Sequence, residues 1–564
     1  MRLYRRNNIE FHPVQMTARQ LSKLPAMHAI LKWPLFAILT VAVFSLLLFY
    51  MIVRSCVLAA EALLETSSIR KLSRRLALAT SQEEYRATAR QLDSAAGIDA
   101  WKKSRDSPFF SSQYVEKQTR DLLLAKERDD INKVIKTLRV CLCDSNFGGV
   151  LNEALYSQSW EGTKSVVEEY IGAVTMGICY IRSRLHSQPS DCDLRTRVTD
   201  LGSKSSYGRT ALCLSGGGTI ALQHIGVIMS LRAEGLCPKV ICGTSGGAIV
   251  GSFFATRVDA EISRESIPEN FLELSKAFEA TWLQRFKTLF SAGVLFDVDA
   301  AYEKLGSWCK GDMTFLEAYM LTGTILNITV TTHDSHGDTG VLLNYLNAPD
   351  VIIRSAVLSS AAFPLFFKPV QLREKLANGS IVYREAFRYA DGSLVTDIPR
   401  DKLAAMFGVK FAIVSQVNPH VTPFLFRLRG DPGEPLLWRW GSRDSFRGGF
   451  ILAALEVSLK EQMKALVKIV RNLDIGPTVG GLPWVHVFLQ NFVGDVTLVS
   501  KTAFVFKLSR ALDHPSDLKE MKWWIREGEK MTWPKMAMIA ARMRIENALA
   551  DLALEVESNT YLAS

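Results

Sequence analysis

Short apolar runs alternate with helical patterns over the central part of the chain, and this alternation restricts the fold more than any other feature. From Arg209 onward the apolar runs read TALCLS, KVICGTS, TILNITVTT near 324 to 332, and FAIVSQV at 411 to 417. Helical patterns separate them, one from Leu222 to Ala233 and another after Gly246. Continuous apolar strands separated by helices are typical of a parallel sheet covered on both faces. The sequence therefore predicts an α/β core.

The regions on both sides of this core have helical patterns. Residues 56–186 combine strong helix formers with apolar residues spaced three and four apart, and they carry no catalytic constellation. The polar stretch from Ser187 to Tyr207 reads as a linker or a domain boundary, and residues 430–564 return to long helical patterns.

The uncharged run from Trp33 to Val53 predicts a membrane segment. At about 1.5 Å per residue it covers roughly 30 Å, the thickness of a bilayer core, and Lys32 and Arg54 bracket it. A cleavable signal peptide would have a shorter apolar region nearer the start of the chain. A buried core helix and a hairpin within one leaflet remain alternatives to a single-pass helix. Both flanks are basic, so the positive-inside rule does not set the orientation.

Charge and cysteine usage indicate the surroundings of the protein. The chain has 67 Lys and Arg against 57 Asp and Glu, a net charge of +10, and residues 1–32 are basic. This suits an anionic membrane surface better than nucleic acid, because no basic stripe with interleaved aromatic residues recurs in the body of the chain. The nine cysteines have neither metal-ligand nor disulfide-framework spacing, which favours a reducing, cytosol-facing environment. The sequons at Asn327 and Asn378 carry little weight against it.

The pentapeptide Gly243-Thr244-Ser245-Gly246-Gly247 follows an apolar strand and precedes a helix. This is the G-x-S-x-G pattern of a nucleophile elbow, in which small residues let the chain turn sharply and project the serine hydroxyl. A plain glycine-rich turn is the alternative. The strand before it and the helix after it favour Ser245 as a nucleophile, with Gly243 and Gly247 forming the elbow.

A second glycine cluster, Gly216, Gly217 and Gly218, also lies between a strand and a helix. Consecutive glycines expose backbone N–H groups at a helix N-terminus, and such groups suit a phosphate or a developing oxyanion. Two details of the sequence argue against a nucleotide-binding loop. The Gly-Lys-Ser/Thr ending is absent, and Ala221 stands where the third glycine of G-x-G-x-x-G belongs.

A nucleophilic serine needs a base, and a carboxylate is the best candidate here. None of the nine histidines has a distinctive setting, and His224 lies within the helix after the glycine loop, which favours a packing or polar-surface role. Asp391 follows apolar residues in the chain, and the adjacent glycine turn of Asp-Gly-Ser fixes its position. A solvated turn aspartate is the alternative reading.

The blocks GGGT, GTSGG and DGS, in this order, resemble the patatin-like phospholipases, in which a Ser-Asp dyad replaces the Ser-His-Asp triad. The resemblance implies Ser245 as nucleophile, Asp391 as proton acceptor, and the N–H groups of Gly216 to Gly218 as the oxyanion hole. NFGGVLNEALY, SLVTDIPRDKLAAMF and TWPKMAMIAARMRIENAL are similar to the fungal and plant triacylglycerol lipases of that family. The likeness covers most of residues 85 to 550.

Two short segments depart from the family pattern. Ile220 and Ala221 stand where a basic residue and a glycine usually follow the glycine cluster, so a donor or charge near the oxyanion hole is missing. Phe363-Pro364-Leu365 replaces a common Pro-Gly pair. The serine and the aspartate of the dyad are intact, which argues against an inactive enzyme.

These observations predict a membrane-anchored carboxylic ester hydrolase that cleaves fatty acyl esters of glycerolipids, triacylglycerol or phospholipid. The alternatives are a lysophospholipid acyltransferase and a non-catalytic lipid-surface scaffold. No cofactor and no metal are expected, and the partners are membrane or lipid-droplet lipids rather than nucleic acid, with no protein partner indicated. The expected location is the endoplasmic reticulum or the lipid droplet, with the catalytic domain facing the cytosol.

The expected fold is a patatin-like three-layer α/β/α core with a mostly parallel sheet, flanked by helical regions. The predicted divisions are a basic segment 1–32, a transmembrane helix 33–53, a helical domain 56–186, a catalytic domain 208–402 and a mainly helical region 403–564.

Overall fold

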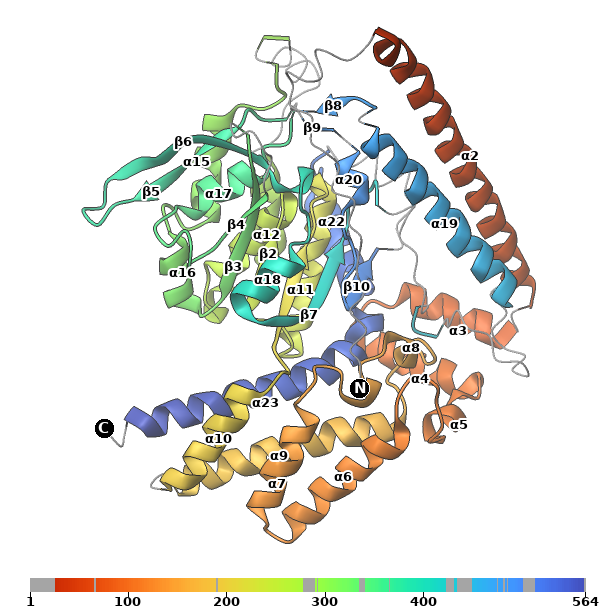
Figure 1. Ribbon diagram of the computed structural model, residues 1–564, viewed down its shortest axis with the longest axis vertical. Helices are drawn as coiled ribbons and strands as arrows, with labels where there is room; N and C mark the ends of the chain where they lie inside the picture. The colour runs from red at the N-terminus through yellow and green to blue at the C-terminus, as the bar shows by residue number, and fades with distance from the viewer. Residues whose placement is uncertain are drawn as a thin grey trace.

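The computed structural model shows a central sheet flanked by helices, with a helical region beneath it and a pair of long helices beside it (Figure 1). It describes residues 26–64, 67–188, 191–276, 290–291, 293–333, 340–364, 366–421, 431–433, 449–473, 475–479, 482–483, 485–500 and 513–561.

The main sheet has eight strands among the described residues, in the order β10-β7-β1-β2-β3-β6-β5, with β4 also paired to β3. Pairing is parallel from β10 to β3, and β4, β5 and β6 add antiparallel pairs. The strands are β1 (Arg209–Leu214), β2 (Val240–Gly243), β3 (Ile325–Thr332), β4 (Gly340–Leu343), β5 (Val370–Lys375), β6 (Ile381–Asp391), β7 (Val409–Gln416) and β10 (Val496–Val499). A separate pair joins β8 (Thr478–Val479) to β9 (Leu482–Pro483).

Helices cover both faces of this sheet. Along β1, Leu212 and Leu214 pack into the large core beneath α11, α12, α17 and α22, whereas Ala211 and Cys213 face a smaller core closed by α18. This alternation is the period-2 pattern of a strand buried on both faces. The helices of this part are α11 (Gln223–Ala233), α12 (Gly246–Ala255), α13 (Ile267–Lys276), α15 (Val298–Trp308), α16 (Phe315–Thr322), α17 (Ile353–Ser360), α18 (Arg400–Phe407), α20 (His486–Leu489) and α22 (Leu518–Thr532). The predicted three-layer α/β/α core with a mostly parallel sheet is confirmed.

The sheet extends beyond residue 402. The strand β7 lies between β1 and the edge strand β10 in the parallel part of the sheet, and β10 follows the long helix α19 (Gly449–Asn472) in the chain. Both strands come from the region expected to be mainly helical, although the apolar run at 411 to 417 already predicted β7, so the division at 402 does not mark the end of the sheet. The very short β10, four residues, is too brief to stand out from a helical background.

The N-terminal region is helical, as predicted, from α3 to α9. Its helices are α3 (Ser67–Leu78), α4 (Gln82–Ala95), α5 (Ile98–Lys103), α6 (Ser112–Glu127), α7 (Ile131–Cys141), α8 (Glu153–Tyr156), α9 (Ser165–Ser187) and α10 (Cys192–Lys204). The linker predicted from Ser187 to Tyr207 is wrong over most of its length, because α10 occupies it. Asp191 caps this helix by accepting the Leu194 amide, and Leu194, Val198 and Leu201 are buried at helical spacing.

The last helix ties the helical region to the sheet. The helix α23 (Met536–Tyr561) packs on α9 and α10, far away in the chain. From it the fully buried Arg542 donates hydrogen bonds to the carbonyl oxygens of Tyr207 and Gly208 and to the hydroxyl of Thr210 at the start of β1. The two regions are therefore joined by a buried, hydrogen-bonded cation.

The predicted apolar segment forms part of one long helix, α2 (Ala26–Leu64), which runs beside α19 (Gly449–Asn472) on one side of the molecule (Figure 1). Among the described residues, Leu31–Val53 is the one stretch long and apolar enough to cross a membrane, and it is not buried within the protein. This exposed apolar helix is compatible with a membrane anchor. The basic segment 1–32 lies mostly outside the described residues.

Candidate active site

Ser245 occupies a sharp turn between β2 and α12. Its backbone has φ 53° and ψ −121°, a conformation that few residues other than glycine adopt. A Cβ on Gly247 would lie 2.2 Å from the Leu214 carbonyl oxygen, and one on Gly243 would lie 2.5 Å from the Gly247 carbonyl oxygen. Only glycine fits at these two positions, so both have the geometry that an elbow requires. The Ser245 amide donates to the Ser360 hydroxyl at 2.9 Å.

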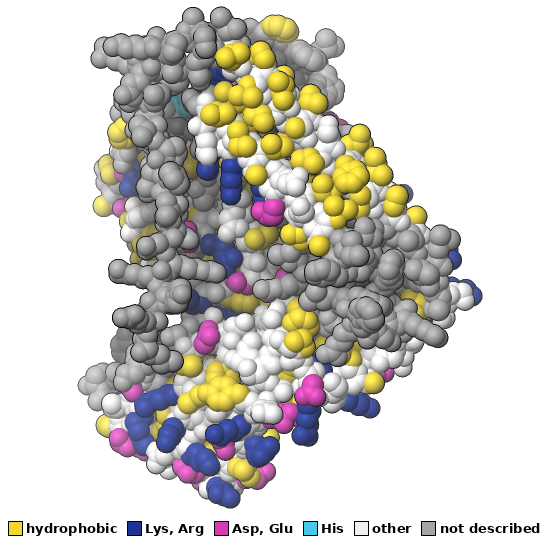
Figure 2. All heavy atoms as spheres, turned by 45° about the vertical axis from the view of Figure 1, so that its right-hand side comes forward, with side chains coloured by type: hydrophobic (Ala, Val, Ile, Leu, Met, Phe, Trp, Pro, Cys, Tyr) yellow, Lys and Arg dark blue, Asp and Glu magenta, His cyan; other side chains and the backbone are white. Residues whose placement is uncertain are grey.

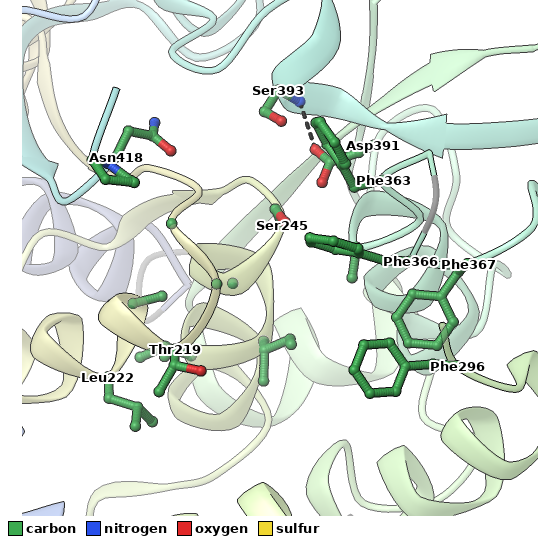
Figure 3. A pocket seen from close by; sticks show the side chains of 18 of the residues that line it. Thr219, Leu222, Ser245, Phe296, Phe363, Phe366, Phe367, Asp391, Ser393 and Asn418 are labelled. Carbon is green, nitrogen blue, oxygen red and sulfur yellow. Dashed lines mark hydrogen bonds between the residues drawn. The ribbon is translucent and has the colours of Figure 1, made fainter. Parts of the chain in front are cut away.

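Asp391 lies at the end of β6 and is 1% exposed. Its Oδ1 accepts the Ser393 amide at 2.7 Å, and its own amide donates to the Ala362 carbonyl oxygen at 3.1 Å. Burial raises the pKa of this carboxyl to about 6, and hydrogen bonds from Ser393 and from the Ser245 hydroxyl oppose that rise. The aspartate is therefore held in one orientation, facing Ser245 (Figure 3).

The strand β3 explains how these two distant residues meet. Its first half, Ile325–Ile328, pairs with β2, which ends just before the elbow. Its second half pairs with β6, where Val330 is the partner of Asp391. Next to Asp391, a Cβ on Gly392 would come within 2.4 Å of the Thr329 carbonyl oxygen, so the chain passes β3 in direct backbone contact. Pairing with one shared strand thus aligns the ends of β2 and β6.

The glycine loop lies beside Ser245, but its three amides differ. Gly216 approaches the serine closely, since a Cβ on it would lie 3.4 Å from the Ser245 Cβ. Its amide, however, donates to Oδ1 of Asp397 at 3.0 Å. Gly217 and Gly218 have φ of 151° and 59°, line the cavity next to Ser245, and donate no recorded hydrogen bond within the described part of the chain. These two amides therefore have no acceptor among the described residues.

Asp397 is a functional candidate that sequence reasoning missed. It is 2% exposed, and its second carboxylate oxygen accepts the side-chain amides of Asn418 at 2.8 Å and Gln416 at 3.5 Å. Burial raises the pKa of Asp397 to about 7, and the nearby Asp391 adds to the rise. The local sequence Thr-Asp-Ile-Pro gives no signal, because the partners come from β7 and the glycine loop.

His224 has hydrogen-bond partners other than Ser245. His224 is buried, donates through Nε2–H to the Ser215 carbonyl oxygen at 2.9 Å, and accepts at Nδ1 from the Ser415 hydroxyl at 2.7 Å. Burial lowers the pKa of His224 to about 4, so the ring is neutral near pH 7 and fastens the glycine loop to β7. The packing role predicted for His224 agrees with this geometry.

His420 is a second feature that the sequence did not single out. It follows β7 and lines the cavity next to Ser245, together with His514. Its Nε2 is buried without a hydrogen-bond partner, and burial lowers the pKa of His420 to about 4. A neutral imidazole with an unused nitrogen can bind a hydroxyl or an ester oxygen of a substrate.

The cavity that contains Ser245 and Asp391 has a volume of about 400 Å³ and a mainly apolar wall. Aromatic side chains form much of that wall, and four of them are visible around the serine in Figure 3: Phe296, Phe363, Phe366 and Phe367. Phe363 is one of the departures from the family pattern, and Leu365 lies outside the described residues. The wall suits a fatty acyl chain.

The other departure, Ile220 and Ala221, forms part of a short 3₁₀ helix, Gly218–Leu222, directly after the glycine loop. Both side chains are buried. A Cβ on Gly246 would meet the Ala221 Cβ at 2.6 Å, so the small side chain at 221 lets this helix pack closely on the elbow. Ile220 and Ala221 therefore fill core space next to the glycine loop and bring no charge to it.

The described residues contain no group of three or more His, Cys, Asp or Glu side chains able to hold a metal ion. The chemistry available at the site is that of a half-buried serine and a buried carboxylate beside an apolar cavity, with backbone donors next to them.

Two protein families match this chain. The family described as patatin-like phospholipase matches residues 212–404, and a domain of unknown function, DUF3336, matches residues 63–198. The first match contains the elbow, the glycine loop and Asp391.

Fungal proteins are similar to the chain over nearly its whole length. "Triacylglycerol lipase ptl2" of Schizosaccharomyces pombe is 35% identical over 93% of this chain and 82% of its own length. A patatin-like phospholipase domain-containing protein of Coccidioides immitis is 33% identical over 96% of this chain and 76% of its length. One from Cryptococcus neoformans is 35% identical over 92% of this chain, which spans 59% of that relative.

Among solved structures, VipD from Legionella pneumophila is similar over 37% of this chain and 50% of its own, with 15% identity and a TM-score of 0.21. ExoU is similar over 45% of this chain and 53% of its own, with 17% identity and a TM-score of 0.20.

Proposed function

The chain belongs to the patatin-like phospholipase family, and from this premise we propose that it hydrolyses fatty acyl esters of glycerolipids, with triacylglycerol as its main substrate. The arrangement of Ser245 and Asp391 at the end of an apolar cavity carries the proposal.

In the proposed reaction, the Ser245 oxygen attacks the ester carbonyl carbon while Asp391 accepts the hydroxyl proton. The tetrahedral oxyanion is stabilised by the amides of Gly217 and Gly218, which have no other acceptor among the described residues. The C–O bond to glycerol breaks, and Asp391 returns the proton to the leaving alkoxide. Water then attacks the acyl-enzyme by the same route and releases the fatty acid.

The carboxylate is suited to this role because its pKa is raised by burial. A carboxylate with the ordinary aspartate pKa is a poor base for a serine hydroxyl, whereas one with a pKa of about 6 has a greater proton affinity and is still ionised near neutral pH. The backbone hydrogen bonds of Asp391 also hold this carboxylate in a fixed orientation.

Two observations support a long-chain neutral lipid. The cavity wall is mostly apolar. The Schizosaccharomyces pombe relative is named a triacylglycerol lipase. Phospholipid is the second substrate class, to be compared directly in the assay.

The lipid substrate fits an enzyme held at a membrane through α2. We place it at the endoplasmic reticulum or the lipid droplet, with the catalytic core in the cytosol. All nine cysteines are free thiols, which suits a reducing compartment. The sequon at Asn327 is fully buried within β3, which agrees with this side of the membrane.

The test is fatty acid release from triacylglycerol and phosphatidylcholine by the purified full chain. Ser245→Ala is expected to lower kcat about a thousandfold or more, and Asp391→Asn about a hundredfold or more. Ser380→Ala and Asp401→Asn, both at exposed positions, are matched controls with expected wild-type activity.

Equal release by all these proteins would contradict the proposal. A fluorophosphonate probe then separates the remaining readings, because labelling of Ser245 without hydrolysis would favour transfer of the acyl group to a lysophospholipid acceptor. Loss of labelling as well would favour a non-catalytic scaffold.

A further inference from the structure

The helix α2 has two different faces. The half-buried face includes Phe36, Leu39 and Tyr50, whereas Ile38, Val41, Phe44, Leu48 and Ile52 are more than half exposed. These exposed residues recur every three or four positions and form one continuous apolar stripe. Figure 2 shows apolar side chains gathered along this side of the molecule.

The half-buried face is covered by α19, which runs antiparallel to α2. Near one end, Phe36 and Leu39 pack with Val470 and Ile475. Further along, the Lys460 ammonium lies over the Tyr50 ring, 4.6 Å from its centre. The contacts therefore extend over the middle of the apolar run, from Phe36 to Tyr50.

The chemistry of α19 conflicts with a bilayer at that depth. Glu461, Lys464 and Lys468 are exposed, and they lie between the two contact points with α2. If α2 crossed a bilayer with α19 attached, these charges would sit in the hydrocarbon core, where charged side chains are costly. A helix lying along the surface avoids this cost, because only its exposed stripe enters the lipid.

The helix that follows, α3, has the composition of a membrane-surface helix. Its sequence SSIRKLSRRLAL places Lys71 and Arg74, both exposed, among apolar residues at helical spacing, and Leu78 is 74% exposed. Basic residues next to an apolar face favour an anionic lipid surface. The basic residues of α3 and the exposed apolar stripe of α2 thus both indicate that this side of the protein binds a lipid surface.

The end of the helix pair reaches the catalytic cavity through α20. Val485, directly before α20, and Leu489, at the end of α20, pack with Phe36, Leu39 and Val470. Between them in the chain, Val487 and Phe488 line the cavity that contains Ser245. One short helix therefore contacts the apolar helix pair and the wall of the active site.

We propose that α2 lies in the plane of a phospholipid surface, with its exposed stripe in the acyl layer and α19 held behind it, and that this seating brings the cavity mouth at α20 to the lipid. The proposal refines the membrane attachment of the proposed function and is independent of its chemistry. An in-plane helix can occupy a droplet monolayer as well as a bilayer, whereas a single-pass helix requires a bilayer.

The first test is protease protection of the full chain carrying different epitope tags at its two ends, bound to sealed vesicles of phosphatidylcholine and phosphatidylserine. In-plane seating leaves both tags on the same side, so protease removes both without detergent. Protection of one tag until detergent is added would show that α2 crosses the bilayer and would overturn the proposal.

The second test measures depth. Single-cysteine variants Leu31→Cys, Phe44→Cys and Ile52→Cys, in a chain whose exposed cysteines are replaced by serine, carry a fluorophore that is quenched by lipids brominated at known depths. Equal depth for all three supports an in-plane helix, and Leu39→Cys, on the covered face, is the control that lipid should quench least. A maximum depth at Phe44 with shallow ends would contradict it.

The third test separates seating from catalysis. Lys71→Glu with Arg74→Glu is expected to weaken binding to phosphatidylserine vesicles about fivefold for each charge removed and to leave hydrolysis of a water-soluble short-chain ester unchanged. Unchanged vesicle binding would overturn the role of α3. Absence of short-chain ester hydrolysis in the wild type would contradict the proposed function, and the topology result would still stand.

Discussion

The amide of Gly216 donates a hydrogen bond to Oδ1 of Asp397, and this bond joins the glycine loop to a buried carboxylate six residues beyond Asp391. It removes one of three predicted donors from the site and fixes the backbone that presents the other two. Asp397 is thus a positioning residue for Gly217 and Gly218.

Replacement of Asp397 should disturb the oxyanion donors more than substrate binding. We expect Asp397→Ala to lower kcat about ten- to a hundredfold with little change in KM, because the loop loses its anchor. Asp397→Asn keeps an oxygen for the Gly216 amide and should recover part of the loss. Steady-state kinetics of both variants provide the measurement, and a change confined to KM would contradict this role.

The activity should depend on the ionisation of Asp391. The carboxyl must be deprotonated to accept the serine proton, and burial raises its pKa to about 6, so kcat/KM should rise with pH through about 6 and then level off. A pH profile with a water-soluble ester avoids effects of pH on the lipid surface. A profile already flat from pH 4.5 would contradict the raised pKa.

The same pKa predicts a gain in stability on substitution. Between pH 4 and 6 the folded carboxyl keeps a proton that the unfolded chain releases, so the free energy of unfolding falls as pH rises through this window. At pH 8, Asp391→Asn should therefore be more stable than the wild type by about 3 kcal/mol, although inactive. Thermal melting of both proteins at pH 5 and pH 8 measures the difference, which should be about half as large at pH 5.

The elbow tolerates no side chain at Gly247. A Cβ there would lie 2.2 Å from the Leu214 carbonyl oxygen, so Gly247→Ala should cost about 3 kcal/mol or prevent folding. Gly251→Ala in the same helix is the matched control, since its Cβ would make ordinary contacts of 3.4 to 3.8 Å. Soluble yield and melting temperature compare the two. Equal stability would show that the elbow can shift.

Filling the cavity should change the preferred chain length. Leu358 is buried on α17 and lines the cavity, and Leu358→Phe adds volume to the wall that we expect to contact the acyl chain. We expect kcat/KM for a long-chain ester to fall about tenfold relative to that for a butyrate ester. A parallel loss for both esters would mean that the substitution disturbs the core instead.

Much of the core and its chemistry could be read from local patterns. The strands β1, β2, β3 and β7 and the helices α11 and α12 lie where apolar runs and helical spacing place them. The elbow was predictable because the glycines around Ser245 meet a local backbone constraint. Histidine was correctly set aside at position 224, because a histidine inside a helix lacks the strand-end setting of a base.

Other features follow no local pattern. The helix α10 was mistaken for a linker because Pro189, Gly202 and polar side chains outweighed three buried apolar residues. The strand β10 is stable only because β7 offers it an edge, and Arg542 joins β1 only because α23 folds back onto the helical region. Each depends on contacts between residues far apart in the chain.

The sequence by itself determined the candidate reacting groups and the apolar helix, because a G-x-S-x-G turn, an Asp-Gly turn and an uncharged helical run are properties of consecutive residues. Only the tertiary structure decided which glycine amides remain available and which face of α2 meets lipid. Those outcomes depend on Asp397 reaching Gly216 and on α19 covering Phe36 and Tyr50. Burial and pairing of this kind are set by the packing of distant elements, which local sequence does not encode.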